Sequence, residues 1–111
     1  MTLHFPPKPG IYKFDRQENG GKSRIHLRLE DNFSGVLVVN AAKMIHLNPT
    51  AGLMAWQYFN DVNIKDVPKQ ITSLFRTNKK QAALDYQDTV SKIEQLISED
   101  SNACPVCDLG L

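Results

Sequence analysis

Hydrophobic and polar positions alternate with a period of two through the first half of the chain. In RIHLRLE, positions 24–30, Ile25, Leu27 and Leu29 alternate with polar residues, a pattern typical of a half-buried β-strand. The apolar segments VLVVN (36–40) and MIHL (44–47) predict two more strands, with turns at DNFSG and AAK between them. Together these segments predict an antiparallel meander.

The N-terminal segment adds a candidate edge strand to this meander. Three prolines in PPKPGIYKF exclude a helix there, and residues 11–14 are expected to form a short strand. The polar segment DRQENGGK then predicts a turn, because Asn19-Gly20 favours the positive backbone angles of a tight hairpin. We therefore expect a sheet of three or four strands.

The period changes to that of a helix directly after Leu47. Asn48 is a favoured N-cap residue. Pro49 suits the first helical position, because the backbone N–H of that position has no acceptor within the helix and its loss costs nothing. Apolar residues then recur at helical spacing, which predicts a helix that packs on the sheet. These residues are Met54, Ala55, Tyr58 and Phe59.

Two further helices are expected downstream. The second has Pro68 in its first turn and an apolar stripe of Val67, Ile71, Leu74 and Phe75. The third begins after RTNKK and carries the seam Ala83, Tyr86, Val90, Ile93 and Ile97, with Leu96 beside it. Strands followed by helices predict an α+β fold of winged-helix type.

Composition limits the class of protein. The 111 residues are 41% hydrophobic and 23% charged, which suits one globular domain. The net charge of +1 disfavours nucleic acid as the main partner, because such domains usually carry a strong basic excess. No apolar run approaches the roughly 20 residues that span a bilayer, and the start resembles no signal peptide. We expect no membrane partner and a cytoplasmic location.

Two cysteines, Cys104 and Cys107, lie in ACPVCDLGL at the end of the chain. Their spacing fits half of a zinc site, a redox CxxC or two inert thiols. A structural zinc site needs four ligands, and the three histidines, His4, His26 and His46, show no matching spacing. Inert thiols are therefore favoured, and no metal site is expected.

The order of elements, the segment LNPTA at 47–51 and the final helix with DYQDTVSKIEQLI resemble the PqqD-like domains. These are recognition elements for ribosomally made, post-translationally modified peptides. The resemblance runs from about Arg24 to Ile97, and it is closest to the version at the N-terminus of radical-SAM peptide-modifying enzymes. It implies an N-terminal extension over 1–23, the peptide-binding domain over 24–98, and a tail or linker over 99–111.

The resemblance implies a binding mode. A precursor (leader) peptide would add as a strand to the last sheet strand, in the groove beside the third helix. The strand residues are Lys43, Met44, Ile45, His46 and Leu47, and the helix wall is Tyr86, Thr89, Val90 and Ile93. Several of these have a second interpretation, because Ile45, Leu47, Tyr86 and Val90 also fit core positions. Lys43, Lys79, Lys80 and Lys92 fit either contacts for acidic leader residues or solvated surface.

The resemblance does not extend to catalysis. A radical-SAM barrel needs a CxxxCxxC motif for its iron–sulfur cluster, and the chain contains one CxxC. S-adenosylmethionine and the cluster are thus expected only in a tethered or partner enzyme, whether that enzyme lies beyond Leu111 or acts in trans. We expect no cofactor and no catalytic residue in this chain.

Two other classes of function stay open from the residues alone. A winged-helix DNA-binding domain has the same elements, but the second helix offers Lys65, Lys69, Gln70 and Arg76 while the third carries Asp85, Asp88 and Glu94, which repel phosphates. A small enzyme is disfavoured because no histidine adjoins a nucleophile and no phosphate-binding loop is found.

Overall fold

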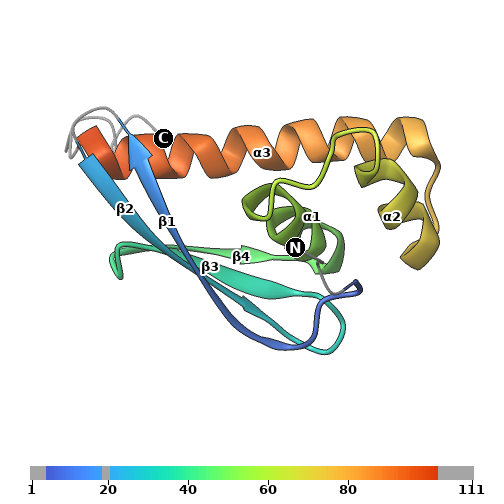
Figure 1. The fold of residues 1–111 in the computed structure, drawn as a ribbon, viewed down its shortest axis with the longest axis horizontal. Helices are drawn as coiled ribbons and strands as arrows, with labels where there is room; N and C mark the ends of the chain where they lie inside the picture. Colours follow the sequence, from blue (N-terminus) through green and yellow to red (C-terminus); the bar gives the residue numbers. More distant parts are fainter. Residues whose placement is uncertain (1–4, 19–20, 103–111) are drawn as a thin grey trace.

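The protein has an α+β fold in which a four-stranded antiparallel sheet is followed by three helices (Figure 1). This architecture confirms the predicted meander and three-helix order. The computed structural model describes residues 5–18 and 21–102. The elements are β1 (Gly10–Glu18), β2 (Gly21–Leu29), β3 (Gly35–Val39), β4 (Lys43–Leu47), α1 (Pro49–Phe59), α2 (Val67–Leu74) and α3 (Lys79–Asn102).

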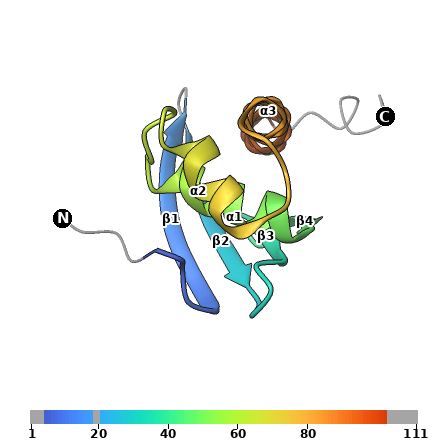
Figure 2. The ribbon, with the colours of Figure 1, turned by 90° about the vertical axis from the view of Figure 1, so that its right-hand side faces the viewer.

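The strands follow one another in space in the order β1-β2-β3-β4, so that β1 and β4 lie at opposite edges of the sheet (Figure 2). At the β4 edge, Val36 pairs with His46 and Leu37 pairs with Ile45. The helices lie on one face of this sheet, and α3 runs along the length of the molecule (Figure 1).

The first two strands are longer than the sequence predicts. The expected strand over residues 11–14 runs from Gly10 to Glu18, and the following strand begins at Gly21 rather than Arg24. The polar residues that suggest a turn are paired across the ladder instead, with Asp15 opposite Arg24. Cross-strand pairing of opposite charges supports such a register. Asn19 and Gly20, the predicted turn, lie outside the described residues.

The core forms between the inner face of the sheet and the helices. As the alternation predicts, Ile25, Leu27 and Leu29 are buried, with 2% or less of their surface exposed. They pack with buried residues of β3 and α1, among them Leu37 and Leu53. Burial of these side chains is the main stabilising contribution to a domain of this size.

The junction between β4 and α1 is a single residue long. Asn48 caps the helix, and its Oδ1 accepts a hydrogen bond from the Ala51 N–H at 2.8 Å, with Pro49 at the start of the helix. Gly52 then faces the turn between β2 and β3, where a Cβ would collide with the carbonyl oxygen of Phe33. The cap and the glycine together hold α1 close to the sheet, directly beyond the end of β4.

Helix α2 departs from its predicted stripe at Leu74 and Phe75, and α3 departs from its own at Ala83. Leu74 is 37% exposed because α2 ends there, and Phe75 already has extended backbone. In α3 the fully buried alanine is Ala82, whereas the predicted Ala83 is half-buried. Tyr86, Ile93 and Ile97 are buried as core residues of the predicted seam.

Candidate functional site

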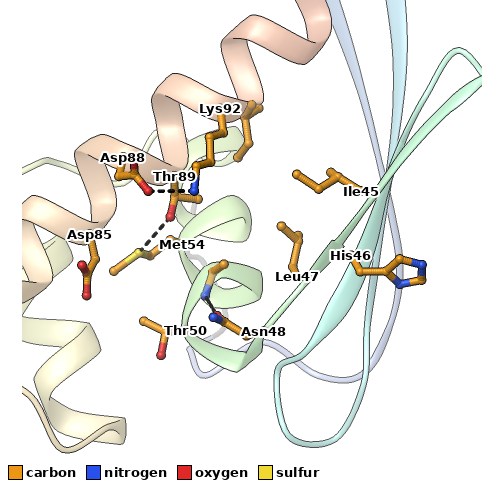
Figure 3. Close-up of a pocket in the computed structure, with 12 residues that line it drawn as sticks. Ile45, His46, Leu47, Asn48, Thr50, Met54, Asp85, Asp88, Thr89 and Lys92 are labelled. Atoms are coloured by element: carbon orange, nitrogen blue, oxygen red, sulfur yellow. Dashed lines mark hydrogen bonds and ion pairs between the residues drawn. The ribbon is translucent and has the colours of Figure 1, made fainter. Parts of the chain in front are cut away.

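A hollow of about 360 Å³ lies between the edge strand β4, the first half of α1 and the middle of α3 (Figure 3). Strand β4 contributes Ile45, His46 and Leu47, and α3 contributes Thr89 and Ile93. These five residues are among the nine that the sequence analysis assigned to a peptide groove. The structure therefore brings the strand edge and the helix wall together around one depression.

The alternation along β4 decides which of its side chains face this hollow. Ile45 is half-buried and Leu47 is buried, and both point toward the helices, whereas the His46 ring points away from them (Figure 3). Met44 is 62% exposed. Met44 and Lys43 belong to the strand but are not part of the lining. His46 and Met44 therefore present their side chains to the outer face of the sheet.

The rotation of α3 differs from the one that the groove assignment assumed. Tyr86 and Val90 were assigned to the groove wall, but Tyr86 is 9% exposed within the core and Val90 packs against it. The adjoining polar stripe of α3 faces the hollow, where Asp85, Asp88 and Lys92 join the predicted Thr89 in the lining. Residues one position apart are turned by about 100° on a helix, so the apolar seam and the groove wall are neighbouring stripes.

The first turns of α1 form a third wall that the sequence analysis did not identify. Asn48, Thr50, Ala51 and Met54 all line the hollow. The Thr89 hydroxyl lies 3.7 Å from the Met54 sulfur, which links this wall to α3. The one-residue junction after β4 was the available signal, because a helix that begins there must lie beside the end of the strand.

The charged residues of the hollow are mixed in sign. Lys92 forms an ion pair with Asp88 at 3.0 Å, and Asp85 accepts a hydrogen bond from the Gln81 side-chain amide at 2.9 Å. Lys92 thus lies in the lining beside a carboxylate, whereas Lys79 and Lys80 are exposed at the start of α3 and are not part of it. An exposed pair of this kind contributes little to stability, and its charges are available to a ligand.

A second polar cluster joins β1, α1 and α3 at a distance from the hollow. The Tyr58 hydroxyl donates a hydrogen bond to Glu94 at 2.6 Å, and the Arg16 guanidinium lies 5.0 Å from the centre of the Tyr58 ring and 3.5 Å from Glu94. Burial, followed by the hydrogen bond to Glu94, raises the pKa of Tyr58 from 10.0 to about 12. The phenol is therefore protonated and acts as a donor at neutral pH.

The residues considered for DNA binding are less well placed than the sequence suggested. Lys65, Lys69 and Arg76 are exposed around α2, but the Gln70 side chain turns inward and accepts a hydrogen bond from Gln57 at 2.9 Å. Cys104 and Cys107 lie outside the described residues. In the ranges that the structure describes, no group of three or more His, Cys, Asp or Glu residues is placed to hold a metal ion.

Comparisons of the chain with protein-family models, with curated proteins and with solved structures found no match. Within residues 5–18 and 21–102, no helix is both long enough and apolar enough to cross a membrane.

Proposed function

We propose that this chain is a non-catalytic recognition domain that binds a precursor (leader) peptide by strand addition at β4 and presents it to a modifying enzyme. The observation that carries the proposal is the hollow between the edge strand β4, α1 and α3. An added strand satisfies the open backbone groups of a sheet edge, and the walls beside it select the side chains. In this proposal the protein is cytoplasmic and its partner is a radical-SAM or other peptide-modifying enzyme, in cis or in trans.

The lining suggests which peptides would fit. Ile45 and Ala51, both half-buried, offer an apolar surface, while Asp85 and Asp88 outnumber Lys92 among the charged groups. A peptide strand that places an apolar side chain on this surface and a basic one near Asp85 would be complementary. This selection differs from the acidic leader residues that the lysines alone suggested.

A display library of random peptides, selected on the wild-type chain, would supply a probe peptide of defined sequence. We expect the selected peptide to shift the amide NMR signals of residues 43–47 and of the α3 stretch 85–93. Shifts confined to α2, or binding of random duplex DNA that weakens steeply with salt, would rule out the proposed site.

Filling the hollow gives a sharper test. Thr89→Trp places a bulky ring between α3 and Met54, so we expect the dissociation constant of the selected peptide to rise by about tenfold or more, or about 1.4 kcal/mol. Gln87→Trp is the matched control, because Gln87 is exposed on α3 and does not line the hollow. Equal affinities of the two variants would contradict binding at this position.

The strand-addition mode itself is testable with N-methylated versions of the selected peptide. In an antiparallel pair only alternate residues direct their N–H groups to the neighbouring strand. A single N-methyl group should therefore weaken binding when it is placed at every second residue of the peptide, and should have little effect at the residues between them. A uniform loss, or none, would exclude main-chain pairing even if the peptide occupied the hollow.

A further inference from the structure

The sheet has a second edge at β1, opposite β4 (Figure 2). Among the described residues, β1 is hydrogen-bonded to a strand on one side, where all nine of its residues pair with β2. A hollow of about 560 Å³ lies along β1 and is lined by four consecutive strand residues, 13–16, with Tyr58, Phe59 and Asp61. Consecutive strand residues point to opposite faces, so a hollow that touches all four borders the backbone edge itself.

The β1 edge is held in position by side chains on the helix face. Phe14 stacks on Phe59 with ring centres 5.1 Å apart, and Arg16 lies over Tyr58 and beside Glu94. Ile11, Lys13 and Asp15 point to the outer face and are exposed. A fixed, extended edge loses little conformational freedom when another strand pairs with it.

Charges on an edge strand normally prevent pairing with further strands, but the charges of β1 alternate in sign. Two antiparallel copies of β1 would be related by a two-fold axis perpendicular to the sheet, which keeps the outer faces of both copies on the same side. The axis must then pass midway between one residue of the strand and the same residue of the other copy. The central choices are Lys13, Phe14 and Asp15.

These three registers differ in their electrostatics. An axis at Lys13 places two lysines opposite each other, and an axis at Asp15 does the same with two aspartates, both of which are unfavourable. An axis at Phe14 places Lys13 opposite Asp15 of the other copy, twice. Phe14 is also the midpoint of Gly10–Glu18, so this register pairs the strand over its whole length.

From this complementarity we infer that the partner of the β1 edge is a second copy of this chain. The two copies form an isologous dimer in which β1 pairs with β1 about an axis at Phe14. The two four-stranded sheets join into one, and β4 remains at each outer edge. The dimer therefore leaves the hollow beside β4 open in both copies, and it does not depend on the proposed peptide binding.

Sedimentation velocity of the full chain over a range of concentrations measures this dimer. Lys13→Glu and Asp15→Lys each replace two attractive pairs with two repulsive ones, so we expect each variant to raise the dimer dissociation constant by at least about tenfold. Lys80→Glu is the matched control, since it makes the same charge change at an exposed position of α3 and should leave the constant unchanged.

The two variants together provide the decisive measurement. In a mixture of K13E and D15K chains, every opposed pair at positions 13 and 15 is again of opposite charge, so the mixture should dimerise more tightly than either variant alone. A carbodiimide should also join Lys13 to Asp15 between wild-type chains, and mixing ¹⁴N- and ¹⁵N-labelled chains identifies such a link as intermolecular. A wild-type chain that stays monomeric, a dimer insensitive to K13E and D15K, or a mixture that fails to associate would each overturn the inference.

Discussion

Gly52 lies where α1 passes over the turn between β2 and β3, and its missing side chain sets the distance between them. A Cβ at this position would meet the carbonyl oxygen of Phe33, a backbone atom that cannot move aside without shifting the turn. Asn48, four residues earlier, fixes the start of the same helix. Single residues therefore determine how closely α1 approaches the sheet and where the wall of the hollow lies.

We predict that Gly52→Ala destabilises the fold by roughly 1–3 kcal/mol, the usual cost of overpacking. The higher helix propensity of alanine, worth about 1 kcal/mol, offsets part of this cost. Urea unfolding followed by circular dichroism measures the change. An unchanged midpoint would show that α1 does not pack as closely on Phe33 as the structure places it.

A second residue-scale prediction concerns the turn between β3 and β4. Asn40 and Ala41 have φ of 55° and 60°, and alanine adopts such angles at a cost of roughly 1–2 kcal/mol. Ala41→Gly should therefore stabilise the fold by about 0.5–1 kcal/mol, after the greater entropy of glycine in the unfolded chain is included. Thermal unfolding measures the change in the free energy of unfolding. Ala42→Gly, at the next exposed position outside this pair, should not raise that free energy.

At the scale of elements, α3 has two roles on adjacent stripes. Tyr86, Ile93 and Ile97 close the core, and the stripe with Asp85 and Thr89 forms one wall of the hollow. Farther along, Glu94 ties the same helix to Tyr58 on α1 and to Arg16 on β1. This cluster ties α3 and α1 to the edge strand β1, and none of its three residues lines the hollow beside β4.

The Tyr58 cluster gives a prediction about pH. Because the pKa of Tyr58 is about 12 in the folded chain and the ordinary value is 10.0, the folded state holds this proton more tightly than the unfolded state. The associated stability is complete below pH 10 and is lost as the pH rises toward 12.

Near-ultraviolet absorbance of tyrosinate, recorded against pH, measures this ionisation. Tyr58→Phe should remove the contribution of Tyr58 to the late part of the titration. The contribution of Tyr86, whose pKa is raised mainly by burial, should remain. Glu94→Gln should lower the pKa of Tyr58, because the carboxylate raises it both as a hydrogen-bond acceptor and by its charge. A titration curve unaltered by Glu94→Gln would contradict the contact.

At the scale of the whole molecule, the sheet presents two open edges to different partners in our proposals. Strand β4 lies beside α1 and α3 and is proposed to take a peptide, while β1 is proposed to pair with its own copy. The two edges lie on opposite sides of the molecule (Figure 2). A dimer would thus carry two peptide sites far apart, and each edge can be disrupted by its own substitutions without affecting the other.

Local signals in the sequence determined the identity and order of the elements. The period of two in β2 and the N-cap at Asn48 each depend on a few neighbouring residues, which is why the strand–helix junction was predicted at the correct position. The lengths of β1 and β2 were not predictable in this way. Their polar residues have the composition of a turn. They lie in strands because they pair across the ladder, as Asp15 does with Arg24.

Tertiary structure alone decided which side chains meet at the hollow. The seam of α3 is readable from its spacing, but its rotation against β4 depends on how Tyr86 and Ile93 pack on the rest of the core. That rotation turned Asp85 and Asp88 to the hollow beside the predicted Thr89, while Tyr86 and Val90 pack with the core. A helical period specifies which residues share a stripe, whereas the neighbour that each stripe faces is set by long-range packing that no local pattern contains.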